Sequence, residues 1–207
     1  MAHDDAASRD TLPAPPDDID SGASFAVLAG GCFWCLEAVF REVNGVTSVV
    51  PGYCGGDRKS ANYEAVCRGN TGHAEAVRIE FDPVRIRYGD LLKIFFFAAH
   101  DPTQKDRQGA DRGTQYRSAI FYADEGQRQL AKRYIEAIDA SHKLPGPVVT
   151  QLAPLTEFYQ AEPYHHDYAA KNPDQPYIRY VSNPKVEKLR LYFAPVLNRA
   201  RSREAAS

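Results

Sequence analysis

The chain has 207 residues, of which 43% are hydrophobic and 25% are charged, and its formal net charge is −2. This length and composition are typical of one globular domain with a buried core. The charge gives no electrostatic basis for binding nucleic acid or an anionic membrane, and no apolar run is long enough to span a bilayer. Because the first 20 residues lack the apolar segment of a secretion signal, we expect a cytoplasmic protein with reduced cysteines.

In chain order, the hydrophobic pattern predicts strands and helices between two polar ends. We expect a disordered leader over residues 1–23, a single domain over 24–198 and a flexible tail over 199–207. Apolar, β-branched or alternating runs predict strands at 25–29, 46–50, 77–81, 117–122 and 148–152, with a glycine-rich turn at 51–56. Helices are expected at 36–43, 88–99, 125–140, 162–171 and 184–198. This order indicates an α/β or α+β fold in which helices pack on a sheet.

The segment Gly30–Cys35 carries the most informative chemical signal. Its two glycines allow a tight turn out of the first strand, which places Cys32 at the first turn of a helix. The unpaired N–H groups and the positive end of the helix dipole favour a thiolate, so we expect a lowered pKa and a nucleophilic Cys32. The adjacent Phe33 and Trp34 are suited to form the walls of an apolar pocket. The glycines and the second cysteine make an ordinary core cysteine the weaker alternative.

Cys32 and Cys35 form a Cys-x-x-Cys pair that has three interpretations. A zinc site needs a second pair, but Cys54 and Cys67 are far apart in the chain and no histidine lies at ligand spacing. A haem attachment site needs a histidine where the chain has Leu36. A redox pair needs only two sulfurs one helical turn apart. We therefore expect a redox function with no metal and no cofactor.

A series of motifs resembles the peptide methionine sulfoxide reductase A family, which acts on the S epimer of methionine sulfoxide. The motifs follow the family's order and are Gly31–Trp34, Gly52–Gly56, Tyr63–Cys67, Thr71–Glu75, His100–Gln104, Arg107–Gly109, Asp111, Gly113–Ser118, Phe158–Tyr159, Ala161–Glu162 and Tyr164–His165. So many ordered motifs are more specific than the cysteine motif alone. The resemblance implies an α+β fold, a ferredoxin-like sandwich with a mainly antiparallel sheet and surrounding helices.

The resemblance also implies roles for individual residues. Cys32 would attack the sulfoxide sulfur, and Phe33 and Trp34 would hold the substrate methyl group. Glu75 would protonate the sulfoxide oxygen, because an apolar pocket raises the pKa of a carboxyl group and keeps it protonated. The residues implied to surround or support that oxygen are Tyr63, Tyr116 and Asp111. Without the resemblance, the glutamate would be interpreted as a solvated strand residue and the tyrosines as core or rim aromatics.

A second thiol must resolve the sulfenic acid formed on Cys32, and here the chain departs from the commonest form of the family. Many members carry the resolving cysteine near the C-terminus, where this chain has Ile178 and no cysteine. We favour Cys35, one helical turn away. Cys54, in a turn that we expect to be mobile, is the second candidate, and Cys67 is expected to be structural. A relay from Cys32 to Cys35 and then to Cys54 is a further alternative. The implied final reductant is thioredoxin.

Two other functions fit parts of the sequence. A non-catalytic module would bind oxidised or apolar peptides through the aromatic pair. A general dithiol–disulfide oxidoreductase would use both cysteines but would leave Glu75 and Asp111 unexplained. His165 and His166 are expected at a polar edge rather than in a metal site, because adjacent residues of a helix face different sides. The alternative is that one of them lies near the substrate channel. We expect a monomer.

Overall fold

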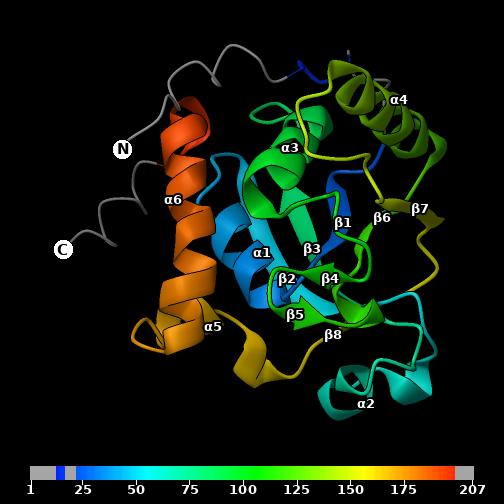
Figure 1. Cartoon of the computed structure of the whole chain (residues 1–207), viewed down its shortest axis with the longest axis vertical. Coiled ribbons are helices and arrows are strands. Elements are labelled where there is room, and N and C mark those ends of the chain that lie inside the picture. The colour runs from blue at the N-terminus through cyan, green and yellow to red at the C-terminus, as the bar shows by residue number, and fades with distance from the viewer. Residues whose placement is uncertain (1–12, 17–21, 199–207) are drawn as a thin grey trace.

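The computed structural model describes residues 13–16 and 22–198 and consists of a sheet with helices packed against it (Figure 1). The predicted leader lies mostly, and the predicted tail entirely, outside the described residues. The strands are β1 (Phe25–Gly30), β2 (Val46–Cys54), β3 (Ala74–Phe81), β4 (Arg107–Gln108), β5 (Asp111–Arg112), β6 (Ser118–Tyr122), β7 (Gln151–Pro154) and β8 (Phe158–Gln160). The α-helices are α1 (Phe33–Arg41), α2 (Tyr63–Cys67), α3 (Tyr88–Ile94), α4 (Glu125–Ser141), α5 (Tyr168–Lys171) and α6 (Asn183–Tyr192).

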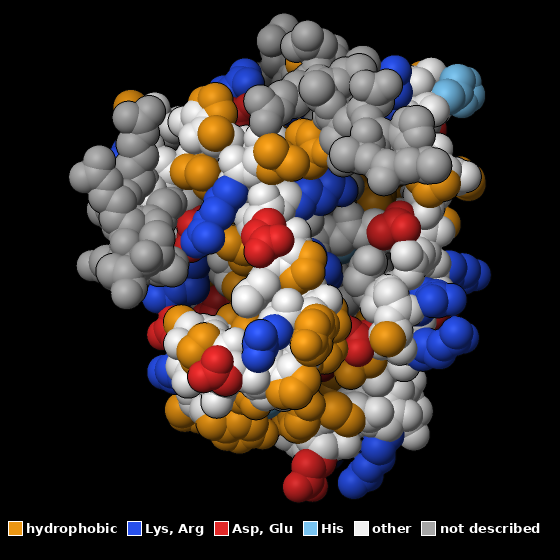
Figure 2. Space-filling model, turned by 60° about the vertical axis from the view of Figure 1, so that its left-hand side comes forward, with side chains coloured by type: hydrophobic (Ala, Val, Ile, Leu, Met, Phe, Trp, Pro, Cys, Tyr) orange, Lys and Arg blue, Asp and Glu red, His pale blue; other side chains and the backbone are white. Residues whose placement is uncertain are grey.

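Shorter helical segments complete the described part of the chain. Two are π-helical: η3 (Phe95–Ala99) continues α3, and η6 (Ile178–Ser182) leads into α6. The 3₁₀ segments are η2 (Arg58–Ser60), η4 (Thr114–Tyr116), η5 (Pro163–His165) and η7 (Ala194–Val196). Among the described helices, none is long and apolar enough to cross a membrane. Figure 2 brings the α6 side forward and shows acidic and basic side chains interspersed, with hydrophobic side chains gathered at the lower end.

The main sheet has six strands in the order β7-β6-β1-β3-β2-β8. Every neighbouring pair is antiparallel except β6 and β7. Helix α1 connects β1 to β2, and α3 with η3 follows β3. The prediction of helices on a mainly antiparallel sheet is therefore confirmed.

Alternation along the strands divides the core between the two faces of the sheet. On β1, Ala26 and Leu28 belong to the larger cluster, which includes residues of α1, α3, α4 and α6, whereas Val27 and Ala29 belong to a smaller one. The Cys-x-x-Cys pair lies in the larger cluster and Cys54 in the smaller one. The thiol of Cys54 is therefore on the opposite face of the sheet from the pair.

Strand β2 continues through residues 51–54, where the sequence predicted a turn. Pro51 lacks an N–H group, but its carbonyl accepts a hydrogen bond from Ala161 at 2.9 Å. Gly52 allows the edge strand β8 to approach, because a Cβ atom there would clash with the carbonyl oxygen of Tyr159. The prediction of a mobile turn at Cys54 is wrong, since Cys54 ends a paired strand and is buried.

The short elements differ most from the predictions. The helix expected at 162–171 is split into η5 and α5, because Asp167 between them has a φ of 57°. The helix expected at 184–198 ends at Tyr192, and the last predicted strand is shifted to β7. Helix α2 and strand β8 were not predicted at all. The longer helices α3 with η3 and α4 lie where the hydrophobic spacing placed them.

Candidate active site

Cys32 lies between the end of β1 and the start of α1, as the glycine pair predicted. Gly31 has a φ of 92°, which favours glycine, and a side chain there would also collide with Gln108. Cys32 is the N-cap residue of α1, with φ −61° and ψ 127°, and it is 7% exposed. The proposed nucleophile is thus held at a helix N-terminus and is almost completely buried.

Cys32 and Cys35 form a hydrogen-bonded pair of sulfurs. Burial raises the pKa of Cys32 well above its usual value, and the hydrogen bond to Cys35 and the charge of Glu75 raise it further. The hydrogen bond from the Trp34 N–H lowers this pKa, but by less. The pKa of Cys35 is lowered to about 6, mainly because Cys32 donates a hydrogen bond to it, with a contribution from the charge of Lys185. The prediction of a lowered Cys32 pKa is therefore wrong, since burial outweighs the helix N-terminus. The first negative charge of the pair is favoured on Cys35.

Glu75 acts on this pair from β3. Its Oε2 atom accepts a hydrogen bond from the backbone N–H of Phe33 at 3.1 Å, which places the carboxyl group at the first turn of α1. Burial raises the pKa of Glu75 to about 8, and the charges of Asp111 and Cys35 act in the same direction, against the hydrogen bond from Phe33. Most of Glu75 is therefore protonated at neutral pH, the state that a proton donor needs.

The predicted companions of Glu75 come from separate segments. Tyr63 begins α2, Tyr116 ends η4 and Asp111 begins β5. Burial raises the pKa of both tyrosine hydroxyls, and the negative charges of Glu75 and Cys32 raise it further. Both hydroxyls therefore stay protonated at neutral pH and can donate hydrogen bonds close to Glu75 and Cys32.

Phe33 and Trp34 have different environments although they are adjacent. Phe33 is 0% exposed, and its ring contacts those of Tyr53 and His165. Trp34 is half-buried and stacks on Tyr168, with 3.8 Å between ring centroids and 7° between planes. Its Nε1–H group donates a hydrogen bond to Nδ1 of His165 at 3.1 Å. The indole ring is therefore fixed by both a stacked ring and a directional bond.

Two residues outside the predicted catalytic set, Glu162 and His165, organise the surroundings of these aromatics. Glu162 accepts hydrogen bonds from the Tyr53 hydroxyl at 2.7 Å and from the Tyr63 N–H at 2.9 Å, which anchors the start of α2. His165 is fully buried, so its predicted place at a polar edge is wrong. The signal available in the sequence was that both lie in motifs of the resemblance.

Comparison with known proteins agrees with this geometry. Residues 24–195 match the family model described as peptide methionine sulfoxide reductase. The chain is 57% identical over 164 residues to peptide methionine sulfoxide reductase MsrA of Nautilia profundicola, covering 79% of this chain and 92% of that protein. It is 51% identical over 172 residues to MsrA of Thermus thermophilus, covering 83% and 96%. The chain belongs to the peptide methionine sulfoxide reductase family.

As a member of this family the protein is an oxidoreductase. Its fold is also found in a solved relative, methionine sulfoxide reductase A of Corynebacterium diphtheriae, with a TM-score of 0.63 and 34% identity. That comparison covers 74% of this chain and 77% of the other.

The remaining two cysteines of this reductase have contrasting environments. Burial raises the pKa of Cys54 to about 12, and its thiol donates a hydrogen bond to the carbonyl oxygen of Glu157 at 3.3 Å. Cys67 is exposed at the end of α2, and the Tyr63 hydroxyl donates a hydrogen bond to its sulfur. The expectation that Cys67 is structural was drawn from its apolar neighbours in sequence, and these neighbours do not cover it.

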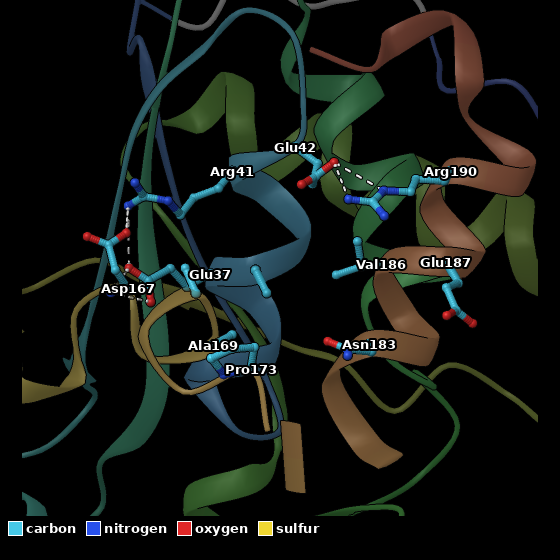
Figure 3. Close-up of a pocket in the computed structure, with 12 residues that line it drawn as sticks. Glu37, Arg41, Glu42, Asp167, Ala169, Pro173, Asn183, Val186, Glu187 and Arg190 are labelled. Atoms are coloured by element: carbon cyan, nitrogen blue, oxygen red, sulfur yellow. Dashed lines mark hydrogen bonds and ion pairs between the residues drawn. The ribbon is translucent and has the colours of Figure 1, made fainter. Parts of the chain in front are cut away.

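The outer side of α1 holds the segment that supports Trp34. Figure 3 shows Glu37 and Arg41 of α1 directed toward Asp167. Both carboxylate oxygens of the buried Glu37 accept the Asp167 N–H at 3.0 Å, and Arg41 forms an ion pair with the Asp167 carboxylate. Tyr168, which stacks on Trp34, follows Asp167 directly. A cavity of about 610 Å³ between α1, α5 and α6 adjoins these residues.

Replacing Glu37 with alanine is expected to lower the free energy of unfolding by about 2 kcal/mol, because the Asp167 N–H loses its acceptor and a buried side chain is removed. Urea unfolding followed by Trp34 fluorescence measures this loss. Glu187→Ala, at an exposed position beside the same cavity, is the matched control and is expected to change stability by less than about 0.5 kcal/mol. Equal losses in both variants would contradict the assigned role of Glu37.

Proposed function

We propose that this reductase converts methionine S-sulfoxide, protein-bound or free, to methionine in the repair of oxidative damage, with Cys32 as nucleophile. The observation that carries the proposal is the Glu75 carboxyl group, buried, largely protonated at neutral pH and hydrogen-bonded at the helix turn that holds Cys32. A sulfoxide oxygen is a poor leaving group until it is protonated. Attack by the Cys32 sulfur therefore needs an acid beside the sulfoxide oxygen. A general dithiol oxidoreductase would not need one.

In the first step, the Cys35 thiolate takes the proton of Cys32 across their hydrogen bond while the Cys32 sulfur attacks the sulfoxide sulfur. Glu75 gives its proton to the sulfoxide oxygen. The original S–O bond then breaks and the hydroxyl group passes to Cys32, which leaves methionine and a sulfenic acid. The substrate gains two electrons and Cys32 loses two.

The other site residues position the substrate in this proposal. When substrate binds, the Tyr63 hydroxyl exchanges its hydrogen bond to Cys67 for one to the sulfoxide oxygen, and Tyr116 donates a second. Both bonds stabilise the charge that develops there. Asp111 supports the protonated state of Glu75 through its negative charge. Trp34 forms the accessible wall for the substrate methyl group, and Phe33 packs behind this wall in the core.

Cys35 then attacks the sulfur of the Cys32 sulfenic acid, releases water and forms a disulfide, which thioredoxin reduces. The hydrogen bond between the two sulfurs supports Cys35 as the resolving residue. Cys54 is on the opposite face of the sheet, and Cys67 belongs to the separate helix α2. Both would need a larger movement to reach Cys32.

Replacing Cys35 with serine is expected to leave the amount of methionine formed in a single turnover unchanged. Repeated turnover with thioredoxin should stop, because no disulfide forms. Mass spectrometry with the sulfenic acid reagent dimedone is expected to detect a stable adduct on Cys32. Cys54→Ser, another buried cysteine, is the control and should keep thioredoxin-dependent turnover. If Cys35→Ser turned over normally with thioredoxin while Cys54→Ser did not, the assignment of Cys35 would be wrong.

We extend the proposal to the architecture and location of the protein. The strand order β6-β1-β3-β2, with α1 and α3 in the connections, supports a ferredoxin-like sandwich as the core. A cluster that includes residues from β1 to α6 supports a single catalytic domain over 24–198. We infer a monomer in the cytoplasm, where thioredoxin keeps thiols reduced.

The direct test uses purified protein, dithiothreitol and the two epimers of N-acetylmethionine sulfoxide, which mimics a peptide residue, together with free methionine sulfoxide. We expect methionine to form from the S epimers only. Failure to produce methionine, or equal use of both epimers, would refute the proposed function.

A further inference from the structure

Tyr177 connects Cys35 to Asp111 through two consecutive hydrogen bonds. In its thiol form, which follows oxygen transfer, Cys35 donates to Oη of Tyr177 at an Sγ–Oη distance of 3.9 Å, and the Tyr177 hydroxyl donates to Oδ2 of Asp111 at 2.5 Å. The ring of Trp34 meets the Tyr177 ring edge-on, with 6.0 Å between centroids, which fixes the phenol in place. The three polar groups come from α1, the segment before η6 and β5, so the tertiary fold brings them together.

The resolving step requires a route for removing the Cys35 proton, and these hydrogen bonds provide one. After oxygen transfer Cys35 carries a proton, and it must lose that proton as it attacks the sulfenic acid. Cys35 is 0% exposed, so bulk water does not reach it, whereas Asp111 is partly exposed. An exit for the proton therefore has to pass through side chains.

The hydrogen bonds of Cys35 lead to one carboxylate acceptor, Asp111, through Tyr177. The other groups with a strong effect on the Cys35 thiol are Cys32, Ser182 and Lys185, and the charge of Cys35 acts on Glu75. Cys32 is the sulfur under attack, Lys185 acts on Cys35 as a positive charge, and a hydroxyl group such as that of Ser182 is a weak base. Glu75 is needed as an acid for the departing hydroxide. The acceptor that remains is the Asp111 carboxylate, reached through Tyr177.

We propose that Tyr177 relays the proton of Cys35 to Asp111 during disulfide formation, a role that rests on the proposed function. The Cys35 proton passes to Oη of Tyr177 while the Tyr177 proton passes to Asp111. The S–S bond forms as the S–O bond of the sulfenic acid breaks. The hydroxide takes a proton from Glu75, which faces the substrate position and regains a proton from solvent after methionine leaves that position. The products are one disulfide, one water, a protonated Asp111 and an ionised Glu75; the two carboxyl groups return to their starting states by proton exchange with solvent, and no further oxidant or reductant is needed.

The test separates the two steps in a single turnover of the full chain without reductant. In a Cys67→Ser background, which removes the exposed thiol, the reduced protein is mixed with N-acetylmethionine S-sulfoxide and quenched at timed intervals. Methionine reports the first step, and loss of the dimedone-reactive sulfenic acid reports the second. Tyr177→Phe keeps the ring but removes the hydroxyl, and Tyr180→Phe is the matched control because Tyr180 is 74% exposed in the same segment.

We expect Tyr177→Phe to slow the second step roughly 10- to 100-fold, with a much smaller effect on the first. The rate of the second step in this variant should also depend more steeply on pH. The Cys35 proton must then be lost before the attack rather than during it. Tyr180→Phe should match the parent protein in both steps. An unchanged second step, or equal slowing of both steps without a change in pH dependence, would overturn the relay.

A second experiment tests the relay independently of the proposed function. Hydrogen peroxide converts the Cys32 thiol to the sulfenic acid with release of water, because Cys32 is 7% exposed and Cys35 is 0% exposed, and no sulfoxide is needed. Slower disulfide formation in Tyr177→Phe supports the relay in this arm as well. Equal rates in Tyr177→Phe and the parent protein refute it, whether or not methionine is formed in the first arm.

Discussion

Replacing Cys32 with serine is expected to lower kcat/KM for methionine S-sulfoxide by about 10⁴-fold or more, because a serine hydroxyl is a far weaker nucleophile and cannot accept the oxygen as a sulfenic acid. The measurement is methionine production with dithiothreitol as reductant. Single-turnover methionine should be lost as well, since the defect lies in the first chemical step.

The matched control is Cys67→Ser, which makes the same change at an exposed cysteine near the site. We expect this variant to keep the activity of the parent protein within about threefold, as an exposed substitution outside the reacting groups should. Activity that survives Cys32→Ser would instead favour a binding module, in which the aromatic residues and not the thiol carry the function.

Replacing Glu75 with glutamine is expected to lower kcat/KM by roughly 10² to 10⁴-fold, because glutamine keeps the shape of the side chain but cannot donate the proton. In the parent protein, the pH profile of kcat/KM should be bell-shaped. Activity falls below pH about 6, where the thiol pair keeps both protons, and above pH about 8, where Glu75 loses its proton. The variant should lose the alkaline limb.

Glu80→Gln provides the control for Glu75, because it makes the same change at an exposed position of the same strand, β3. We expect it to keep both the rate and the bell-shaped profile. An alkaline limb that persists in Glu75→Gln would assign that ionisation to another group, and an unchanged rate would remove Glu75 from the mechanism.

Hydrophobic spacing was sufficient to predict the larger elements of the fold. Helix α4, helix α3 with its continuation η3, and strands β1, β3 and β6 bury continuous or alternating apolar residues, and such patterns are visible in the sequence. The elements that were missed depend on tertiary contacts. Strand β8 exists because Gly52 admits a neighbouring backbone, and η5 and α5 are separated by the left-handed backbone of Asp167. Neither condition can be recognised in the local sequence.

The candidate site shows the same division between local and tertiary information. Cys32 was identified from its glycines and its place before a helix, whereas Glu75, Tyr63 and Tyr116 were identified only through the resemblance. The direction of the Cys32 pKa could not be predicted, because it depends on burial and on the bond to Cys35 rather than on the helix end. Tyr177 was also missed, since its position beside Cys35 and Asp111 depends on where the chain returns before α6.

Peptide mapping of the protein after one turnover without reductant tests whether Cys32 attacks the sulfoxide and Cys35 resolves the sulfenic acid, because it identifies both sulfurs in one experiment. The reduced chain is mixed with excess methionine S-sulfoxide, alkylated, digested and analysed by mass spectrometry, while the released methionine is counted. We predict about one methionine per chain and a disulfide between Cys32 and Cys35. A disulfide from Cys32 to Cys54 or Cys67, or methionine formed with Cys32 still free to react with the alkylating reagent, would contradict the account.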